Sequence, residues 1–334
     1  MITAKEIAKR LHLSEAAVSM ALHNKAGVST KTKKKVIDTA AELGYDFSRI
    51  KTQSAKSEVN GTILFANYKK HGAVVNDSAF FPELSESVYL CCNQSGYQTA
   101  MQYLYDDTDM NRLFQESVAL YKGIILLATE MRSDDLKKWR QCPVPFVVLD
   151  SYHIDVPACY ITINNRQGAY LAASHLIKKS GKQPGYLQSA YPIQNFSERA
   201  EGFFKAVLEN GMSASCTVIH RLTPSVEGAY ADMTEIIKNR DTLASCYFAD
   251  NDLIAIGAVK ALKENGFKIP NDISIIGFDD IPMSACVEPP LSSVHVPIDR
   301  LANIAVKCLT ETIRNNGKET LHIETAAYLQ IRNS

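Results

Sequence analysis

In the first 45 positions, apolar residues recur every three or four places in three short segments, which is the spacing of the inner face of a helix. Each segment follows a serine or threonine that can cap a helix, and Glu6 completes a capping box with Thr3. Three short helices with a tight first turn predict a helix-turn-helix, an all-α head. The predicted helices run from Thr3 to about Leu11, from Ser14 to near Asn24 and from Ser29 to Gly44.

Beyond about residue 59, short β-rich apolar runs alternate with helical segments. Continuous apolar strands separated by helices predict parallel sheets covered on both faces, and the pattern is too long for one sheet. We therefore predict an α/β body of two doubly wound parallel-sheet subdomains. The predicted strands are residues 61–65, 123–128, 145–150, 159–163, 184–189, 216–222, 245–250 and 273–280, and the predicted helices include 165–179, 199–211 and 253–266.

Between these two regions, residues 46–58 are polar and show no apolar periodicity, which is typical of a linker. The predicted organisation is a helix-turn-helix DNA-binding domain in residues 1–48, a hinge linker in 49–58 and the body in 59–334.

The composition is that of a soluble globular chain, since 46% of the 334 residues are apolar and 22% are charged. No run of eighteen apolar residues occurs, and the start, MITAKEIAKR, lacks the apolar segment of a signal peptide. We therefore expect a cytoplasmic protein that does not contact a membrane. The eight cysteines form no C-x-x-C pair and no disulfide framework, which indicates buried small residues and no metal site.

The net charge of zero conceals an asymmetry between head and body. Residues 1–56 carry eleven Lys and Arg against five Asp and Glu, whereas the other 278 residues carry twenty-five against thirty-one. A head of net charge +6 on a body of −6 indicates that the head meets a polyanion such as nucleic acid. On charge alone, a solvated lysine-rich helix is the alternative.

One face of the second predicted helix is neither apolar enough for a core nor charged enough for an ordinary solvated surface. In a helix-turn-helix this helix lies in the DNA major groove, where small side chains let the backbone approach the bases. Lysines that open the third helix can hold phosphates. The alternative is a small helical protein-binding module. The face carries Glu15, Ala16, Ser19, Met20 and His23, and the lysines are Lys31, Lys33, Lys34 and Lys35.

Polar residues cluster at the predicted carboxyl ends of the body's strands, where open α/β sheets bind ligands. Asp150 follows one strand, residues 250–252 follow another, and Asp279 and Asp280 follow a third. Each of them alone suits a helix cap or a turn. Their recurrence at several strand ends makes a ligand site an equal alternative.

Catalytic motifs are not found in the sequence. The chain contains no G-x-S-x-G, no G-x-x-x-x-G-K-[ST] and no G-x-G-x-x-G after a strand, and its eight histidines show no H-E-x-x-H pattern. Asp279 and Asp280 could hold a cation, but a lone acidic pair is weak evidence. We predict no enzyme activity, no catalytic residue and no cofactor.

The segment KEIAKRLHLSEAAVSMALHNKAGVSTKTKKKVIDTAAELGY resembles the N-terminal domain of the LacI/GalR family of bacterial transcriptional regulators. The family pattern is close to D-I-A-x-x-A-G-V-S-x-x-T-V-S-R-V-L-N, followed by G-V-S, a basic helix and L-G-Y. The resemblance implies DNA contacts from Thr3, Ser14, Glu15, Ala16, Ser19, Met20, His23, Asn24, Ser29, Lys31 and Lys34.

The chain departs from this family pattern at two places that bear on DNA reading. The family has an arginine, which suits guanine, where this chain has Met20, which can make only apolar contacts, for example with a thymine methyl. The variable positions after the capping serine are Glu15 and Ala16, and Glu15 could accept a hydrogen bond from a cytosine amino group. The operator can therefore differ from the family's common one.

The hinge also departs from the family. There the corresponding stretch carries Pro-Asn and A-R-x-L, folds on DNA and places a leucine in the minor groove. Those places here hold Phe47, Ser48, Lys51, Thr52 and Ser54. Either another residue, such as Ile50, takes the leucine's role, or the hinge binds without intercalation.

The body resembles the same family in the segments DSAFFPEL, SERAEGF, YFADNDLIAIGAVKALKENGFKIPNDISIIGFDDIP and PPLSSVHVPIDRLA. This implies a periplasmic-binding-protein-like body whose two lobes, joined by three crossovers, close over a small effector. The implied lobes are about 59–162 with 291–322 and about 163–290 with 323–334. The implied effector contacts are Phe80, Asp150, Arg199, Asn251 and Asp279, and Tyr191 is added as an aromatic that suits the apolar face of a sugar.

Within this cleft we predict Arg199 opposite Asp279, with Asn251 on the same rim. Asn251 and Asp279 lie at the ends of neighbouring predicted strands, and Arg199 opens the helix that follows residues 186–198. A structural ion pair is the alternative role for the arginine.

The chain is thus identified as a member of the LacI/GalR family, with operator DNA as partner. It is predicted to be a transcriptional repressor controlled by a sugar or sugar derivative, a purine being the other possible effector. We expect a homodimer on a near-palindromic site, formed mainly by the outer helices of the first lobe, including residues 82–96. The competing class is a solute-binding protein without a DNA function, against which the basic head argues.

Overall fold

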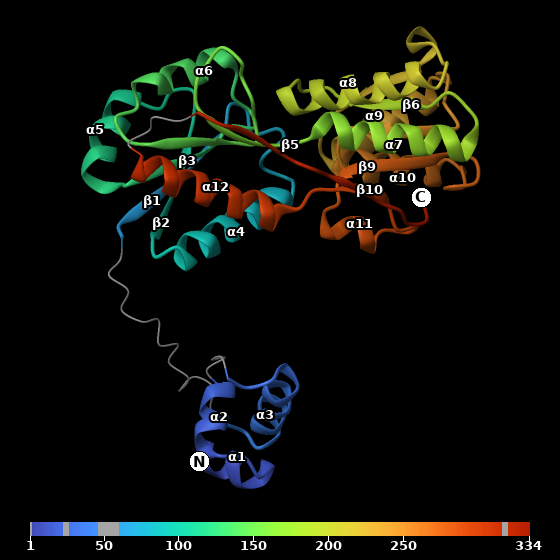
Figure 1. The fold of residues 1–334 in the computed structure, drawn as a ribbon. Helices are drawn as coiled ribbons and strands as arrows, with labels where there is room; N and C mark the ends of the chain where they lie inside the picture. The colour runs from blue at the N-terminus through green and yellow to red at the C-terminus, as the bar shows by residue number, and fades with distance from the viewer. Residues whose placement is uncertain (1, 23–26, 46–59, 316–319) are drawn as a thin grey trace. The chain divides into compact units, whose positions relative to one another are not determined.

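The computed structural model describes residues 2–22, 27–45, 60–315 and 320–334 (Figure 1). The chain divides into two compact units, Met1–Glu58 and Val59–Ser334, and each is described by itself below. No helix in the described ranges has the length and apolar character that a membrane crossing requires.

The first unit contains three short helices, α1 (Ala4–Leu11), α2 (Glu15–Leu22) and α3 (Thr30–Glu42). Thr3 and Glu6 form both hydrogen bonds of the predicted capping box. The first helix therefore has its predicted bounds, and the third ends two residues before Gly44, whose φ of 71° suits glycine after a helix end. The inner faces of the three helices share one small core, made of Ile7, Ala8, Val18, Ala21, Leu22, Val36 and Ala40.

The first lobe of the body is built on a fully parallel six-stranded sheet of order β11-β5-β4-β3-β1-β2. Helices cover both faces because successive residues of its central strands are apolar on both sides. The strands are β1 (Thr62–Tyr68), β2 (Gln98–Leu104), β3 (Gly123–Leu127), β4 (Phe146–Leu149), β5 (Cys159–Ile163) and β11 (His322–Thr325). The helices are α4 (Phe80–Gln94) and α12 (Ile298–Arg314), which lie side by side on one face, and α5 (Met110–Leu120), α6 (Ser133–Lys137) and the 3₁₀ helix η2 (Lys138–Gln141) on the other.

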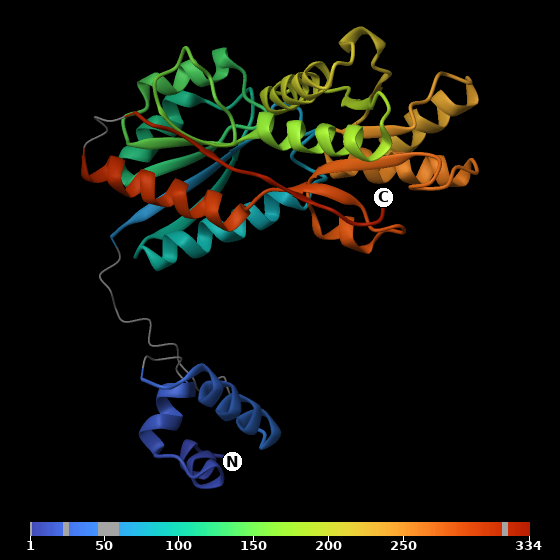
Figure 2. The same ribbon diagram turned by 45° about the vertical axis from the view of Figure 1, so that its right-hand side comes forward.

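The second lobe repeats this plan with the order β12-β10-β9-β8-β6-β7, in which β12 alone runs antiparallel to its neighbour. Helices again cover both faces of the sheet (Figures 1 and 2). The strands are β6 (Gly185–Ser189), β7 (Ile219–Leu222), β8 (Cys246–Ala249), β9 (Ser274–Asp279), β10 (Ser292–His295) and β12 (Tyr328–Gln330). The helices are α7 (Asn165–Ser180), α8 (Gln194–Glu209), the 3₁₀ helix η3 (Ala214–Cys216), α9 (Val226–Lys238), α10 (Asp252–Glu264) and α11 (Pro282–Cys286).

The predicted fold class is confirmed, but two predicted lobe boundaries are wrong. The strand β10 was assigned to the first lobe, yet it pairs in parallel with β9 and so belongs to the second sheet. The strand β11 pairs with β5 over residues 322–325, so the last crossover follows residue 325 and not residue 322. The chain therefore passes between the lobes after β5, after β10 and after β11.

All eight predicted strands exist, and four further strands were missed. The missed strands are β2, β10, β11 and β12, which are short or lie at a sheet edge and mix polar with apolar residues. The helix predicted over 199–211 begins earlier, at Gln194, so Arg199 lies in its second turn and does not open it. The predicted burial of cysteines holds for Cys92, Cys159, Cys246 and Cys308, whereas Cys216 and Cys286 are exposed.

Candidate functional site

The predicted DNA-reading face of α2 is exposed at Glu15, Ala16 and Ser19. Met20 differs because it is half-buried, with its sulfur only 3.5 Å from the place where a Cβ on Gly27 would lie. On α3, Lys31 and Lys34 are exposed. The exposed part of the head thus combines small and acidic side chains on one helix with cations on the next.

Three of the residues predicted to contact DNA serve as helix caps in the head. Thr3 accepts from the amide of Glu6 at 3.4 Å, Ser14 from that of Ala17 at 3.1 Å and Ser29 from that of Thr32 at 3.2 Å. They fix the starts of all three helices. His23, Asn24 and the hinge residues lie outside the described residues.

A cavity in the body lies between the lobes, at the carboxyl ends of strands from both sheets. It holds only about 20 Å³ of space, enough for roughly one water molecule. Five of the six predicted effector contacts line it together. The full lining is Val74, Ser78, Phe80, Phe81, Thr129, Asp150 and Ile163 from the first lobe and Ile193, Asn195, Phe196, Arg199, Asn251 and Asp279 from the second.

Arg199 is the centre of the second lobe's wall and is almost completely buried. Its Nη2 donates to Asp279 Oδ1 at 3.1 Å, as the predicted opposition of the two requires, and its Nε donates to Asn165 Oδ1 at 2.9 Å. Its Nη1 donates to the carbonyl of Asp250, and its guanidinium carbon lies 3.6 Å from the ring centre of Phe278. These contacts hold the guanidinium in one orientation.

The close approach of α7 and α8 makes this arrangement possible. A Cβ on Gly202 of α8 would lie 2.1 Å from the carbonyl oxygen of Arg166 on α7, so only glycine fits there. The contact brings Asn165, at the start of α7, within hydrogen-bond distance of Arg199.

Asp150 joins the lobes across the cleft. Its Oδ2 accepts from Thr129 Oγ1 at 2.6 Å within the first lobe, and its Oδ1 accepts from Asn195 Nδ2 of the second lobe at 2.9 Å. Asp150 and Asp279 have φ angles of 64° and 103°, which are uncommon for residues other than glycine. Such backbone strain at two strand ends is typical of functional positions.

The remaining predicted contacts differ in their placement. Phe80 opens α4 and lines the cavity, and Asn251 caps α10 by accepting from the amide of Ile254 at 3.0 Å. Tyr191 does not line the cavity: its side chain is 39% exposed, and its ring centre lies 5.3 Å from that of His71 in the first lobe. The prediction for Tyr191 is therefore corrected to the extent that its ring contacts His71 of the first lobe and is not part of this cavity's lining.

Sequence reasoning missed Asn195 and Thr129. Asn195 lies four residues before Arg199, so the two share one face of α8, and placing the helix start at Gln194 would have revealed it. Thr129 is the second residue after the end of β3 and repeats the pattern of polar residues at strand ends.

The electrostatics of the cleft are dominated by carboxyl groups. Burial raises the pKa of Asp150 to about 6 and that of Asp279 to about 6, although Arg199 opposes both shifts. Burial also raises the pKa of Asp250 and of Asp252, the residues on either side of Asn251, to about 7.

A buried carboxylate, Glu130, shapes the first lobe's wall. Its Oε2 accepts from the amides of Lys70, His71 and Gly72 at 2.8–3.1 Å, and its Oε1 accepts from those of Val74 and Val75 at 3.0 and 3.3 Å. Burial raises the pKa of Glu130, but these backbone hydrogen bonds outweigh it and leave the pKa below its usual value. One side chain thus fixes the loop that carries a cleft residue.

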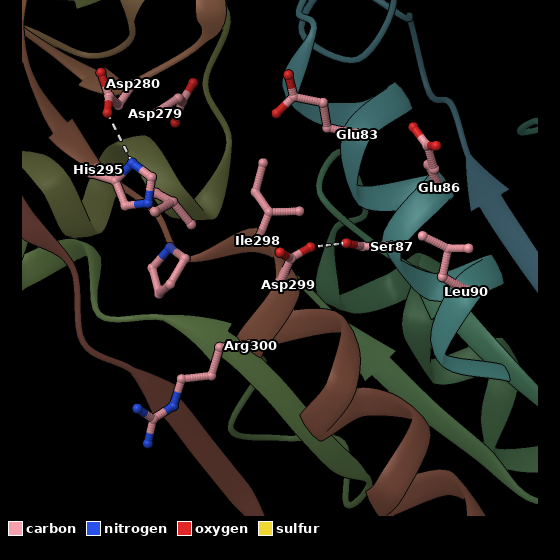
Figure 3. A pocket seen from close by; sticks show the side chains of 12 residues that line it. Glu83, Glu86, Ser87, Leu90, Asp279, Asp280, His295, Ile298, Asp299 and Arg300 are labelled. Carbon is pink, nitrogen blue, oxygen red and sulfur yellow. Dashed lines mark hydrogen bonds and ion pairs between the residues drawn. The ribbon is translucent and has the colours of Figure 1, made fainter. Parts of the chain in front are cut away.

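A larger cavity of about 540 Å³ lies between α4, the ends of β9 and β10 and the start of α12 (Figure 3). Its carboxylates are partly engaged within the protein. Asp280 pairs with His295 at 2.8 Å and with Arg332 at 2.6 Å, and Asp299 accepts from Ser87. Glu83 and Glu86 face the same space from α4 (Figure 3). Among the described residues, no group of three His, Cys, Asp or Glu side chains could hold a metal ion.

A helix-turn-helix head and a two-lobed body with polar groups gathered between the lobes define a class of protein, the DNA-binding regulators with a periplasmic-binding-protein-like body. Residues 3–47 match the family described as bacterial regulatory proteins, lacI family, and residues 173–334 match the periplasmic binding protein-like domain.

Two curated relatives match almost end to end. The chain is 30% identical over 343 residues to the HTH-type transcriptional repressor PurR of Pasteurella multocida, covering 100% of this chain and 98% of that protein. It is 31% identical over 313 residues to the HTH-type transcriptional regulator GalS of Salmonella typhimurium, covering 92% and 88%. A solved LacI family transcriptional regulator from Enterococcus faecalis V583, with bound ribose, is 25% identical and covers 82% of this chain and 98% of that one at a TM-score of 0.67.

The chain belongs to the LacI family of bacterial regulatory proteins. It is a DNA-binding transcriptional regulator, as the resemblance of its head and body segments predicted.

Proposed function

We propose that this regulator is a homodimeric repressor that acts in the cytoplasm and whose affinity for its operator changes when a small sugar binds between the lobes of the body. The observation that carries the proposal is the ion pair of Arg199 with Asp279 beside Asp150 in one interlobe cavity. Charged and polar groups of this kind suit the hydroxyls of a sugar, and the phenylalanines of the same wall suit its apolar face.

The contact between Asp150 and Asn195 supports a coupling to DNA binding. A ligand that inserts between the lobes has to compete with or rearrange this interlobe hydrogen bond, so its binding changes the relative free energy of lobe arrangements. Because the first lobe begins at the residues that follow the hinge, a change in lobe arrangement can reach the head through the chain.

Exposed apolar side chains support the homodimer. Four of them lie on α4 and the edge strand β2 of the first lobe, and each is about half exposed: Tyr89, Leu90, Met101 and Tyr103. Apolar groups gathered on one face are typical of a protein interface. A two-fold symmetric dimer would place two heads on a near-palindromic operator.

The experiment that tests the proposal begins with selection of the operator from random DNA by the full chain. The affinity for that operator is then measured by fluorescence anisotropy, with and without each member of a panel of sugars and purine bases. We expect at least one sugar to change the operator Kd by roughly 5- to 150-fold. If only purine bases change the operator Kd, the proposed effector class is wrong. If panel members bind the body but none of them changes the operator Kd, the proposed coupling between effector binding and DNA binding is wrong.

The role of α2 in recognising the DNA sequence is tested by comparing Met20→Arg with Lys34→Ala in the same selection from random DNA. The arginine adds two donors suited to guanine, so the selected motif should gain a guanine. Loss of the lysine should weaken binding to all sequences alike and reduce the slope of log K against log salt by about one. An unchanged motif for Met20→Arg would show that this half-buried position does not contact bases.

A further inference from the structure

The charged groups of the interlobe cleft are unequal in number. Among the described residues that line it, Arg199 is the single cation, and it faces two carboxyl groups, those of Asp150 and Asp279. A third buried carboxyl group belongs to Asp250, whose backbone carbonyl accepts from the same guanidinium. One positive charge therefore lies among three buried carboxyl groups.

The guanidinium of Arg199 is also largely occupied as a donor. Of the five N–H groups that an arginine has, three donate to Asn165, Asp250 and Asp279. One face of its plane lies on Phe278. Phosphate and carboxylate groups are held best by two parallel N–H groups of one arginine, and here Nη2 is already engaged by Asp279.

A second negative group placed in this cleft would be buried beside acids without a cation of its own. Burying a charge without a partner is costly, and nearby carboxylates of the same sign add repulsion. The larger cavity offers no better place, because five carboxyl groups line it against one arginine, Arg300, and His295 is already paired with Asp280 (Figure 3). The five belong to Glu83, Glu86, Asp279, Asp280 and Asp299.

The same atoms suit a neutral ligand that brings hydrogen-bond donors. Carboxylate oxygens of Asp150 and Asp279 accept from hydroxyl or N–H groups. The phenylalanines Phe80, Phe81 and Phe196 and three aliphatic side chains form the rest of the wall and can contact the faces of a ring.

We propose that the effector is a neutral ring compound rich in hydrogen-bond donors, and that the cleft rejects the phosphate ester of that same compound. The shared chemistry fits a free sugar and a free nucleoside. This inference rests on the proposed function, in which the interlobe cleft is the effector site.

Matched pairs of compounds test the inference on the full chain. The pairs are D-ribose with ribose 5-phosphate, D-glucose with glucose 6-phosphate, and inosine with inosine 5′-monophosphate. Binding is measured by isothermal titration calorimetry, and the shift in unfolding temperature gives an independent measure. We expect the neutral member of a binding pair to bind at least about 100-fold more tightly than its ester. An ester that binds as tightly as its neutral parent overturns the inference.

The variant Asp150→Asn then assigns the discrimination to the cleft. It removes one buried negative charge with little change in volume, so the preference for the neutral member should fall by about tenfold or more. Asp134→Asn is the matched control, because the Asp134 side chain is exposed on α6, and it should leave the preference unchanged. If Asp150→Asn does not fold, Asp279→Asn takes its place, because it removes an equivalent charge. An unchanged preference in a folded cleft variant contradicts the inference.

Failure of this inference and failure of the proposed function give different results. If a phosphate ester binds the cleft and changes operator affinity, the cleft is the effector site, but the proposed rejection of phosphate esters is wrong. If a neutral compound binds with the expected preference but leaves operator affinity unchanged, the proposed rejection of phosphate esters is correct. The proposal that this compound controls DNA binding is then wrong.

Discussion

The two lobes build their sides of the cleft by different means. The second lobe places Arg199 and Asp279 on a helix and at a strand end, and fixes the arginine by three hydrogen bonds and an aromatic ring. The first lobe contributes four apolar side chains among its seven lining residues, and two of the seven, Val74 and Ser78, come from the segment between β1 and α4. In that segment five backbone amides of residues 70–75 donate to Glu130, and Lys70 Nζ pairs with Asp135 at 2.7 Å. The second wall is therefore held mostly by regular structure, whereas part of the first wall is a loop held by side-chain contacts.

This difference indicates a division of roles. A wall whose polar groups are already oriented loses little entropy when it binds a ligand, so specificity should depend mainly on the second lobe. A loop held by a few side-chain contacts can rearrange at lower cost than packed helices and strands, so this part of the first lobe can adapt to lobe closure. The comparison predicts that substitutions in the two walls differ in size and in how far their effects spread.

The largest effect is expected for Arg199→Ala. It leaves Asp279 buried without its cation, and breaking a buried ion pair in this way costs about 3–5 kcal/mol of the free energy of unfolding. Urea unfolding of the full chain measures this loss. The matched control is Arg221→Ala, since Arg221 is exposed and makes one long hydrogen bond of 3.4 Å to Gln188; its effect should be within about 0.5 kcal/mol. Equal effects for the two variants would contradict the account of the second wall.

A pH dependence of stability is the next largest effect. The pKa of Asp252 is raised by burial from 3.8 to about 7, so the folded chain binds this proton more tightly than the unfolded chain does. The resulting stability is fully present below pH 3.8 and is lost as the pH rises through about 7. We expect the free energy of unfolding to fall by roughly 2 kcal/mol between pH 5 and pH 8, with Asp250 contributing in the same direction.

The variant Asp252→Asn provides the check on this dependence. An amide does not titrate, so the unfolding free energy of the variant should vary less between pH 5 and pH 8 than that of the wild type, whatever its absolute stability. The exposed Asp241 is the control position, and Asp241→Asn should keep the wild-type slope. A slope that is the same in all three proteins would show that Asp252 is ionised throughout this range.

The most local effect is expected for Glu130→Gln. The side-chain amide keeps one acceptor oxygen and loses the other, so some of the five backbone N–H groups lose their partner, at a cost of about 1–3 kcal/mol. Hydrogen exchange should become faster in residues 70–75 and stay unchanged in α8. Faster exchange in both walls would mean that the loop and the second lobe are one cooperative unit.

The regular parts of the fold could be predicted because their signals are local. The capping box of Thr3 and Glu6, and apolar runs such as residues 123–127, give the head helices and the central strands directly. The edge strand β2 was missed because only one of its seven side chains is fully buried and its residues are mixed in polarity. The lobe assignment of β10 depends on pairing with β9, a contact between distant elements for which a single sequence carries no signal.

The residues of the cleft could likewise be predicted only where the signal in the sequence is local. Its strand-end residues Asp150 and Asp279 were found because the carboxyl ends of parallel strands meet at one edge. Asn195 was missed because the first turn of α8 is polar and was taken as part of the loop. Glu130 was missed because its partners are backbone amides about 60 residues earlier in the chain, which no side-chain pattern records.

The most direct test of the central claim is the operator affinity of Asp279→Asn as a function of effector concentration. The variant keeps the size of the side chain and an oxygen that can accept from Arg199, but it loses the charge. Fluorescence anisotropy should show wild-type operator binding without effector, and a response that needs at least about tenfold more effector than the wild type. An unchanged effector response in a folded variant would show that the cleft between the lobes is not the site that controls DNA binding.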